Sequence, residues 1–419
     1  MSSKRHIHVI GAGMAGLSAA LQLTLMGESV TIYEAAPFAG GRCRSYFDHE
    51  LDCRIDNGNH LVLSGNVAIH DYLFLTNALD QMRGPGEPIF PFMDLKSGER
   101  WIAHMNKGRM PWWIFDNKKR VAGTHPWDYL SAFNILTAGW QSTVASKFPT
   151  KSLLYRRFWE PLCIAALNTE AEAASAQLLA AIFRQSFGMG GKACCPLIPK
   201  IGLSETFVQP CLNLLRNHDR HVKFGFRLRG LNIASGQINE LDFGSEKIVL
   251  DANDWVILAV PPWSASELLP EILIPTEFRS IINVHFRVEV PHNPAGFTGL
   301  IGGLAEWVFV KKDVVSVTIS AAERHENIAS DTLVKIVWRD LARLFDLDPE
   351  KMPVYRIVKE KRATFAATPD QNLRRPRAYT QWNNLALAGD WTATGLPSTI
   401  EGAIRSGVKA AQVVLRWGS

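Results

Sequence analysis

The sequence predicts an α/β fold, on three observations near the start of the chain. A β-type run over His6–Ile10 leads into a glycine-rich turn over Gly11–Gly16, and the small and apolar residues of Leu17–Met26 predict a helix. A second β-type run, Ser29–Tyr33, ends at Glu34. This order of strand, glycine turn, helix and strand with a terminal acid is typical of a Rossmann-like dinucleotide-binding unit.

Each residue of this unit has a specific role in binding a dinucleotide. Gly11 permits the tight turn, Gly13 lets the backbone approach a pyrophosphate, and Gly16 lets the helix pack closely on the strand. The N–H groups at the helix start, around Ala15, offer hydrogen bonds and a partial positive charge to the phosphates. Glu34 is placed to accept hydrogen bonds from the ribose hydroxyls.

A glycine-rich and basic segment follows this unit. Gly40 and Gly41 free the backbone, and Arg42 and Arg44 lie at positions i and i+2, where an extended chain directs both toward one anion. Arginine suits bidentate contacts with phosphate, so the segment favours FAD over NAD as the dinucleotide. The alternative is a flexible surface loop with solvated arginines.

The C-terminal region contains a further predicted strand, and a carboxylate follows it closely. The apolar run Leu385–Ala388 predicts a short buried strand. Gly389 and Asp390 follow it directly, and a carboxylate at that position can bind ribityl hydroxyls.

A helix is predicted just after this strand. Ser398 and Glu401 have the spacing of a capping box, which predicts a helix that begins near Thr399. The N–H groups around Thr399 and Ile400 would then point at the pyrimidine edge of a flavin, where the helix dipole stabilises negative charge. The alternative is a capped terminal helix without a ligand.

Composition limits the classes of function. The 419 residues are 47% hydrophobic and 20% charged, as in globular proteins, and a net charge of +5 without a long basic run predicts no nucleic-acid partner. No Cys or His spacing matches a zinc site, so we expect no metal. No apolar run is long enough to span a bilayer, so we expect no transmembrane helix. The six cysteines form no C-x-x-C pair and indicate reduced thiols, as in a cytoplasmic protein.

These residues together resemble the FAD-dependent amine oxidase and phytoene desaturase superfamily. The resemblance is carried by Gly11–Gly16, Glu34, Gly40–Arg42, Gly389–Asp390 and Glu401–Ala403. It implies bound FAD and a Rossmann-like FAD-binding domain of this type with an inserted mixed α+β substrate domain. It also implies that Asp254–Pro262 forms the strand that returns to the FAD-binding domain, and that a strand over His221–Leu231 contacts adenine near Leu228.

A closer resemblance is to the hydroxysqualene dehydroxylases. It is carried by Gly41–Tyr46, Asp56–Leu61, Leu63–Asn66, Phe158–Leu162 and Ala166–Thr169. This family implies the reductive removal of the hydroxyl of hydroxysqualene, a long-chain isoprenoid, to give squalene in hopanoid synthesis. Oxidative desaturation of a carotenoid precursor and a non-catalytic prenyl-carrier role remain open as alternatives, and the electron donor is external and unidentified.

The family layout implies a discontinuous arrangement of domains. The FAD-binding domain is expected to comprise residues 1–70, 200–265 and 355–419, and the substrate domain residues 71–199 and 266–354. Helical patterns over Leu153–Leu167 and Glu172–Phe187, and alternating patterns over 280–290 and 306–320, predict the walls of the substrate pocket.

The segment after the arginine motif is expected to pass along the flavin ring, by analogy with the family. Asn57 and Gly58 are expected to contact the flavin, and Asp56, Asn59 and His60 are the candidate catalytic residues. His60 is the first candidate for the proton donor, because the pKa of histidine is ordinarily near neutral, whereas Asp56 is better suited to a scaffold role. Alternatively, Asn59 and His60 only bond to backbone or flavin edges.

One aromatic stretch allows two interpretations. Trp112–Phe115 is flanked by the basic residues Lys107, Arg109, Lys118, Lys119 and Arg120. If exposed, it suits an anchor at the inner face of the membrane, from which the substrate would enter. If buried, it is a core element with charged ends.

Overall fold

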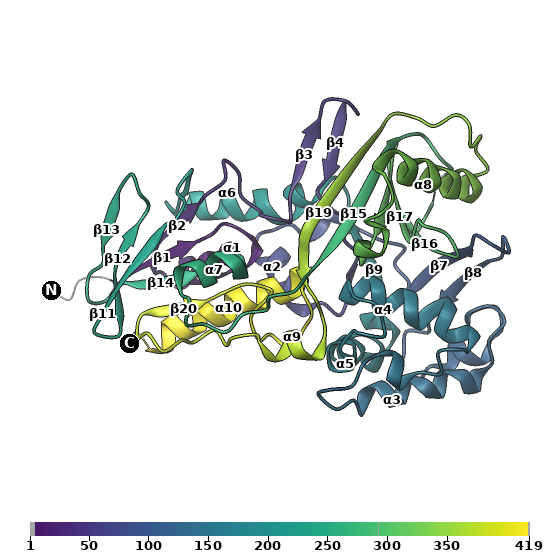
Figure 1. Cartoon of the computed structure of the whole chain (residues 1–419), viewed down its shortest axis with the longest axis horizontal. Coiled ribbons are helices and arrows are strands. Elements are labelled where there is room, and N and C mark those ends of the chain that lie inside the picture. Colours follow the sequence, from purple (N-terminus) through teal and green to yellow (C-terminus); the bar gives the residue numbers. More distant parts are fainter. Residues whose placement is uncertain (1–4, 292, 418–419) are drawn as a thin grey trace.

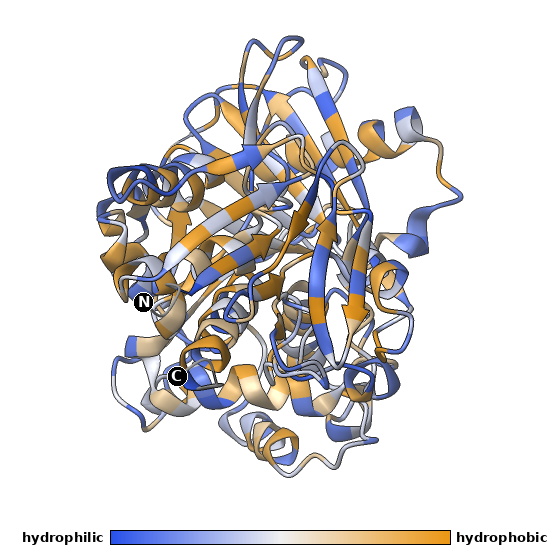
Figure 2. Cartoon of the chain, turned by 90° about the vertical axis from the view of Figure 1, so that its left-hand side faces the viewer, coloured by the Kyte–Doolittle hydropathy of each residue, from blue (hydrophilic) through white to orange (hydrophobic). Residues whose placement is uncertain are grey.

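The structure is a computed structural model that describes residues 5–291 and 293–417. Residues 1–4 and 418–419 of the predicted FAD-binding segments lie outside it. Two large sheets organise the described residues: a parallel sheet on the side of the two termini, and a mixed sheet farther from them (Figure 1). Figure 2, viewed from the end with the termini, shows hydrophobic and hydrophilic residues alternating along the outer strands there.

The parallel sheet follows from the sequence pattern. Within the described residues its order is β10-β2-β1-β14-β20, so distant chain segments become neighbours. Its strands are β1 (His6–Ile10), β2 (Ser29–Glu34), β10 (Val222–Phe224), β14 (Trp255–Leu258) and β20 (Leu385–Leu387). The strands predicted at both ends of the chain thus share one sheet, which confirms the Rossmann-like fold class.

Two helices from opposite ends of the chain pack against each other beside this sheet. They are α1 (Met14–Leu25) and α10 (Ile400–Trp417). A Cβ atom at Gly407 of α10 would overlap the carbonyl oxygen of Ala15, so the absent side chain permits the close approach. The other helices near the parallel sheet are α2 (Val67–Leu75), α6 (Gln209–Asn217), α7 (Pro262–Leu268) and α9 (Pro369–Leu373).

The start of α10 is as predicted, but the predicted capping box is wrong. The Ser398 hydroxyl donates to the Asp390 carboxylate instead. Glu401 is buried and accepts two N–H groups in the first turn of α2, at 3.1 and 2.9 Å. Thr399, and not Ser398, caps the start of α10, because its Oγ1 accepts the N–H of Gly402 at 3.0 Å. The free N–H groups of α2 stabilise the Glu401 carboxylate, and tertiary contacts therefore override local capping.

The second sheet is mixed, with the order β19-β15-β18-β17-β16-β7-β8 in the described chain. Its strands are β7 (Ile89–Asp94), β8 (Arg100–His104), β15 (Phe278–Arg287), β16 (Phe297–Ile301), β17 (Trp307–Lys311), β18 (Val314–Ile319) and β19 (Tyr355–Phe365). Helix α8 (Ser330–Phe345) packs its apolar side against one face. The alternating patterns at 280–290 and 306–320 do form strands of this sheet.

Short helices form the end of the molecule farthest from the termini (Figure 1). They are α3 (Ala132–Leu136), α4 (Glu160–Leu167) and α5 (Ala176–Gln185), and a π-helical turn at Tyr155–Trp159 precedes α4. Helix α5 begins four residues later than the predicted Glu172, because the N–H of Ser175 donates to Ala367 O at 2.7 Å and its backbone is extended.

Smaller strands complete the described fold. They are β3 (Ser45–Asp48), β4 (Cys53–Asp56), β5 (Val62–Leu63), β6 (Met82–Arg83), β9 (Pro196–Pro199), β11 (Gly230–Ala234), β12 (Gln237–Asp242) and β13 (Lys247–Val249). The strand expected over His221–Leu231 is divided between β10 and β11, and Leu228 lies between them. Residues 355–365, expected in the FAD-binding domain, form β19 and pair with β15 in the mixed sheet.

Candidate functional site

The glycine turn between β1 and α1 forms a tightly packed backbone with an open side. The N–H of Gly11 donates to Tyr33 O at 2.7 Å, and a Cβ atom at Gly16 would overlap the Gly11 carbonyl oxygen. At Gly13, by contrast, an added Cβ atom would meet nothing within 4 Å. No side chain among the described residues caps α1, and its first turn holds no acid. Its first N–H groups, including that of Ala15, therefore suit a phosphate.

Glu34 holds the end of β2 next to this turn. Its Oε2 accepts the N–H of Ala12 and its Oε1 the N–H of Ala36, both at 2.8 Å. The backbone of Phe226, which follows β10, donates to Glu34 O at 2.9 Å, so the segment that carries Leu228 lies beside β2. This arrangement brings the predicted ribose and adenine contacts to one edge of the parallel sheet.

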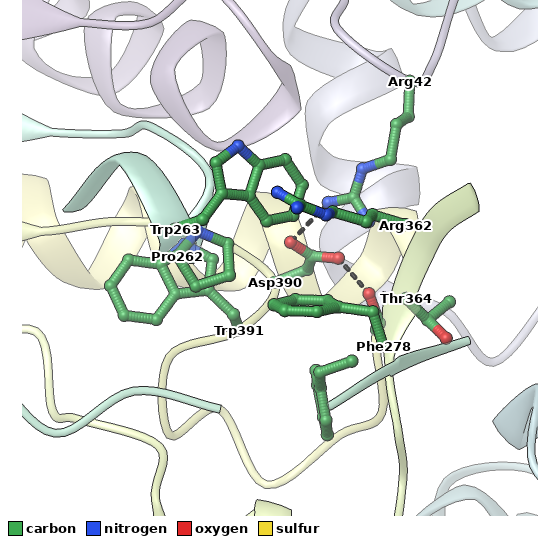
Figure 3. Close-up of a pocket in the computed structure, with 10 residues that line it drawn as sticks. Arg42, Pro262, Trp263, Phe278, Arg362, Thr364, Asp390 and Trp391 are labelled. Carbon is green, nitrogen blue, oxygen red and sulfur yellow. Dashed lines mark hydrogen bonds and ion pairs between the residues drawn. The ribbon is translucent and has the colours of Figure 1, made fainter. Parts of the chain in front are cut away.

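The arginine motif connects the glycine turn to the C-terminal segment. The N–H of Gly40 donates to Ala12 O at 2.8 Å, and Gly41 lies next to Gly13. The Arg42 guanidinium contacts the Asp390 carboxylate at 2.6 Å (Figure 3). Residues predicted from the two ends of the sequence therefore meet in one place.

A small pocket surrounds this ion pair. Figure 3 shows Arg362 close to Arg42 and Asp390, with the Trp263 ring beside it, and the guanidinium carbon lies 4.8 Å from the centre of that ring. The cationic and aromatic lining fits the phosphate and ring of a flavin nucleotide. Neither Trp263 nor Arg362 was predicted as a site residue, although Trp263 directly follows the segment Asp254–Pro262 that the family resemblance indicated.

Arg375 fixes the loop that carries Asp390. It is buried and donates to the carbonyl oxygens of Asp390 and Thr392 and to Thr394 Oγ1. Burial lowers the pKa of Arg375 to about 10, and the residue stays charged near neutral pH. Gly389, which directly precedes Asp390, has a φ of +151°, and a Cβ atom there would overlap the Trp391 indole. These contacts together hold the loop that carries Asp390 in place.

Three donor groups contact the carboxylate of Asp56. Lys311 Nζ lies 2.5 Å from Oδ2, and Ser45 Oγ and the N–H of Leu203 donate to Oδ1 at 2.6 and 2.9 Å. The carboxylate is buried and joins β4, β17 and the segment before α6. These contacts fit the scaffold role considered for Asp56, because they connect three separate segments of the chain.

The next residues of this segment belong to an amide network. Asn59 Nδ2 donates to Thr318 Oγ1 at 3.0 Å, and Thr318 donates to Asn283 Oδ1 at 2.8 Å. Asn283 in turn donates to Asn57 O at 3.2 Å, and its Nδ2 lies close to Gly58. Asn283 and Thr318 were missed from the sequence, although an amide between apolar neighbours, as Asn283 is between Ile282 and Val284, is a detectable signal.

His60 is half-buried and lies near charged groups of both signs. Burial lowers the pKa of His60 to about 4, with Asp56 opposing and Arg42 and Lys311 reinforcing the shift. The ring is therefore neutral near pH 7. It can donate one hydrogen bond, but it is not a protonated acid at that pH.

The comparisons with known proteins agree with this geometry. The model of the flavin containing amine oxidoreductases matches residues 14–415. A hydroxysqualene dehydroxylase from Sinorhizobium fredii is 45% identical over 411 residues, and one from Rhodopseudomonas palustris is 43% identical over 413 residues. These alignments cover 98% of this chain and 98% and 99% of the two relatives.

Solved structures show the same fold at much lower identity. The cyclohexylamine oxidase from Brevibacterium oxydans matches with a TM-score of 0.72 and 15% identity, over 98% of both chains. The family match and the two relatives show that the class of protein is a FAD-dependent oxidoreductase. The chain belongs to the flavin containing amine oxidoreductase family and, within it, to the hydroxysqualene dehydroxylases.

Two further properties concern the described residues only. None of their helices combines the length and apolar character needed to cross a bilayer. No group of three or more His, Cys, Asp or Glu among them is arranged to hold a metal ion.

Proposed function

We propose that this chain removes the hydroxyl of hydroxysqualene reductively and releases squalene. The observation that carries this proposal is the 45% identity to a named hydroxysqualene dehydroxylase over nearly the whole of both chains. The reaction consumes a hydride and a proton and releases water. When bound, reduced FAD supplies the hydride.

The binding residues follow from the geometry of the site. Gly13 and the N–H groups near Ala15 would hold the diphosphate, with Arg42 on its other side. Asp390 would bind the ribityl chain, because its loop is fixed by Arg375. Thr399 and Ile400, at the start of α10, would face the pyrimidine edge of the ring.

Three candidate residues then differ in the chemistry they can supply. Asp56 is ion-paired with Lys311 and keeps the ring-side segment in place. Asn59 is bonded to Thr318 and orients the same segment. His60, neutral because burial lowers its pKa to about 4, would donate an N–H hydrogen bond to the leaving oxygen, and the proton that completes the released water would come from solvent rather than from an imidazolium.

The substrate chain is expected to lie against the aromatic side of the mixed sheet. Phe92, Phe158 and Trp159 form part of a buried cluster between the sheet and α4 and α5. Beside it, a cleft of about 260 Å³ lies between α4 and the loop after β16, but charged residues such as Glu160 and Glu306 line it, so the apolar part of the site is the aromatic cluster and not this cleft. An apolar and water-poor space suits an allylic cation, because water would otherwise add back.

Location and electron supply complete the proposal. A substrate of this kind partitions into lipid, so the chain would act in the cytoplasm at the inner face of the membrane. One dinucleotide fingerprint is present in the sequence, at Gly11–Gly16, so an external donor would reduce the flavin.

The test is a single-turnover experiment. FAD-loaded protein is reduced chemically without oxygen and mixed with hydroxysqualene, and the products are analysed by mass spectrometry. Squalene in an amount equal to the flavin supports the proposal. A more unsaturated product from oxidised protein and a carotenoid precursor would instead show a desaturase, and failure to bind FAD would favour the prenyl-carrier alternative.

A further inference from the structure

The aromatic stretch Trp112–Phe115 is neither wholly buried nor wholly exposed. Trp113 and Ile114 point inward and are 7% and 8% exposed. Trp112 and Phe115 point outward and are 64% and 58% exposed. One side of this stretch therefore packs in the core, and the other side exposes aromatic rings to the exterior.

These outward rings belong to a larger surface, called here the end patch. Its members are Trp112, Phe115, Trp127, Leu130, Phe133 and Trp140, each between 50% and 73% exposed. Every tryptophan counted as exposed in the described residues lies in this patch. The patch extends over three successive short elements, the last of them α3, and the turn after α3, at the end of the molecule away from the termini (Figure 1).

The inner sides of the same elements are already packed. The ring centres of Trp113 and Tyr129 lie 5.2 Å apart, and Tyr129 Oη accepts the N–H of Val121 at 3.0 Å. Ile135 of α3 is fully buried. The outward aromatic residues consequently cannot turn into the core, and their exposure is a fixed property of the fold.

The charge around the end patch indicates what covers it. Residues 107–151 contain seven Lys and Arg but only two acids, Asp116 and Asp128, so their net charge of +5 equals that of the whole chain. Within the described part of the chain, Lys107, Arg109 and Lys118 are in no ion pair. A second copy of this chain would bring like charges together, whereas an anionic surface would neutralise them.

We propose that the end patch is a docking surface for a lipid bilayer with anionic headgroups. Tryptophan and phenylalanine side chains would enter the headgroup region, and the surrounding Lys and Arg would contact lipid phosphates. The inference rests on exposure and charge and not on the identity of the substrate. It extends the proposed location by assigning the contact to particular residues.

Vesicle flotation of the FAD-loaded protein tests this proposal. Vesicles of phosphatidylcholine alone are compared with vesicles that also contain phosphatidylglycerol. We expect the protein to float with the mixed vesicles, and the bound fraction to fall as salt increases. The variant Trp112→Ala/Trp127→Ala/Phe133→Ala should lose about tenfold in binding, and Lys107→Gln/Arg109→Gln/Lys118→Gln should lose binding to anionic vesicles selectively.

The matched control removes exposed apolar side chains elsewhere. Phe74, Val249 and Leu373 are 71%, 75% and 58% exposed and lie outside the patch, so Phe74→Ala/Val249→Ala/Leu373→Ala should bind like the unchanged chain. Flavin absorbance and circular dichroism confirm that each variant is folded. No flotation of the unchanged chain, equal flotation of the patch variant, or a dimer that depends on the patch would each overturn the proposal. Flotation without squalene formation would instead leave the docking surface supported and contradict the proposed reaction.

Discussion

The phosphate end and the ring end of the candidate site are built in different ways. At the phosphate end, the glycine turn, Glu34 and Arg42 come from one continuous segment near the start of the chain. Backbone atoms take part in most of the hydrogen bonds that shape this end. At the ring end, Asp56 and Asn59 depend on Lys311 and Thr318, which lie more than 200 residues away in sequence. The first is a local motif and the second a product of tertiary structure.

This difference predicts different responses to substitution. The phosphate end should be sensitive to added volume, because its chain segments touch without side chains between them. The ring end should be sensitive to lost charge and hydrogen bonds, because its side chains are buried in a connected network. Four predictions, taken from the largest expected effect to the smallest, test the contrast.

The largest effect is expected at Gly16. A Val side chain there would overlap the Gly11 carbonyl oxygen, so Gly16→Val should yield protein that is unstable and binds no FAD. Gly13→Ala is the matched control, since a Cβ there meets nothing within 4 Å. It should keep its melting temperature but lose about tenfold in FAD affinity, because the methyl group lies where the phosphate approaches. Thermal melting measures the stability of the two variants, and FAD titration measures their affinity for FAD. A Gly13→Ala protein as unstable as Gly16→Val would refute the contrast.

The next effect concerns the buried ion pair. Lys311→Met removes the partner of Asp56 and should lower the free energy of unfolding by about 3 kcal/mol, as when other buried pairs are broken. Lys312→Met is the control, because Lys312 is exposed and should change stability by less than about 0.5 kcal/mol. Urea unfolding reports both values. Equal stability of the two variants would mean that the ion pair contributes nothing to the ring-side structure.

A smaller effect is expected for His60, which is proposed to contact the leaving oxygen. His60→Ala should leave FAD bound but slow turnover at least about tenfold, or about 1.4 kcal/mol. Because the His60 pKa is near 4, the rate should not rise between pH 7 and pH 6 as it would if an imidazolium were the acid. Near-normal turnover of the variant would leave His60 only a structural role.

The smallest effect, about 1 kcal/mol per pH unit in a variant that lacks one ring, is expected in the pH dependence of stability. Burial lowers the pKa of His8, His60 and His285 from 6.5 to about 4. The neutral rings stabilise the fold fully above pH 6.5, and this contribution is lost as the pH falls from 6.5 toward 4, on the order of 1 kcal/mol per pH unit for each ring. His285→Gln should reduce the slope of stability against pH in that window. An unchanged slope would contradict the assignment for His285.

The same contrast between local motif and tertiary contacts decides which parts of the site could be predicted from the sequence. The parallel sheet, α1 and the start of α10 were predicted because their glycine, acid and apolar patterns act locally. The capping of α10 was not, because Glu401 serves the start of α2 and Ser398 serves Asp390. The partners of Asp56 and Asn59 lie on strands whose pairing no local pattern specifies.

The central claim is that both ends of the chain hold a single FAD. A crystal structure of the FAD complex tests it most directly. The claim predicts one FAD with its diphosphate at Gly13 and Arg42, its ribityl chain at Asp390, and its ring between Gly58 and the start of α10. A FAD whose diphosphate and ribityl chain lie away from either Gly13 or Asp390 would contradict it.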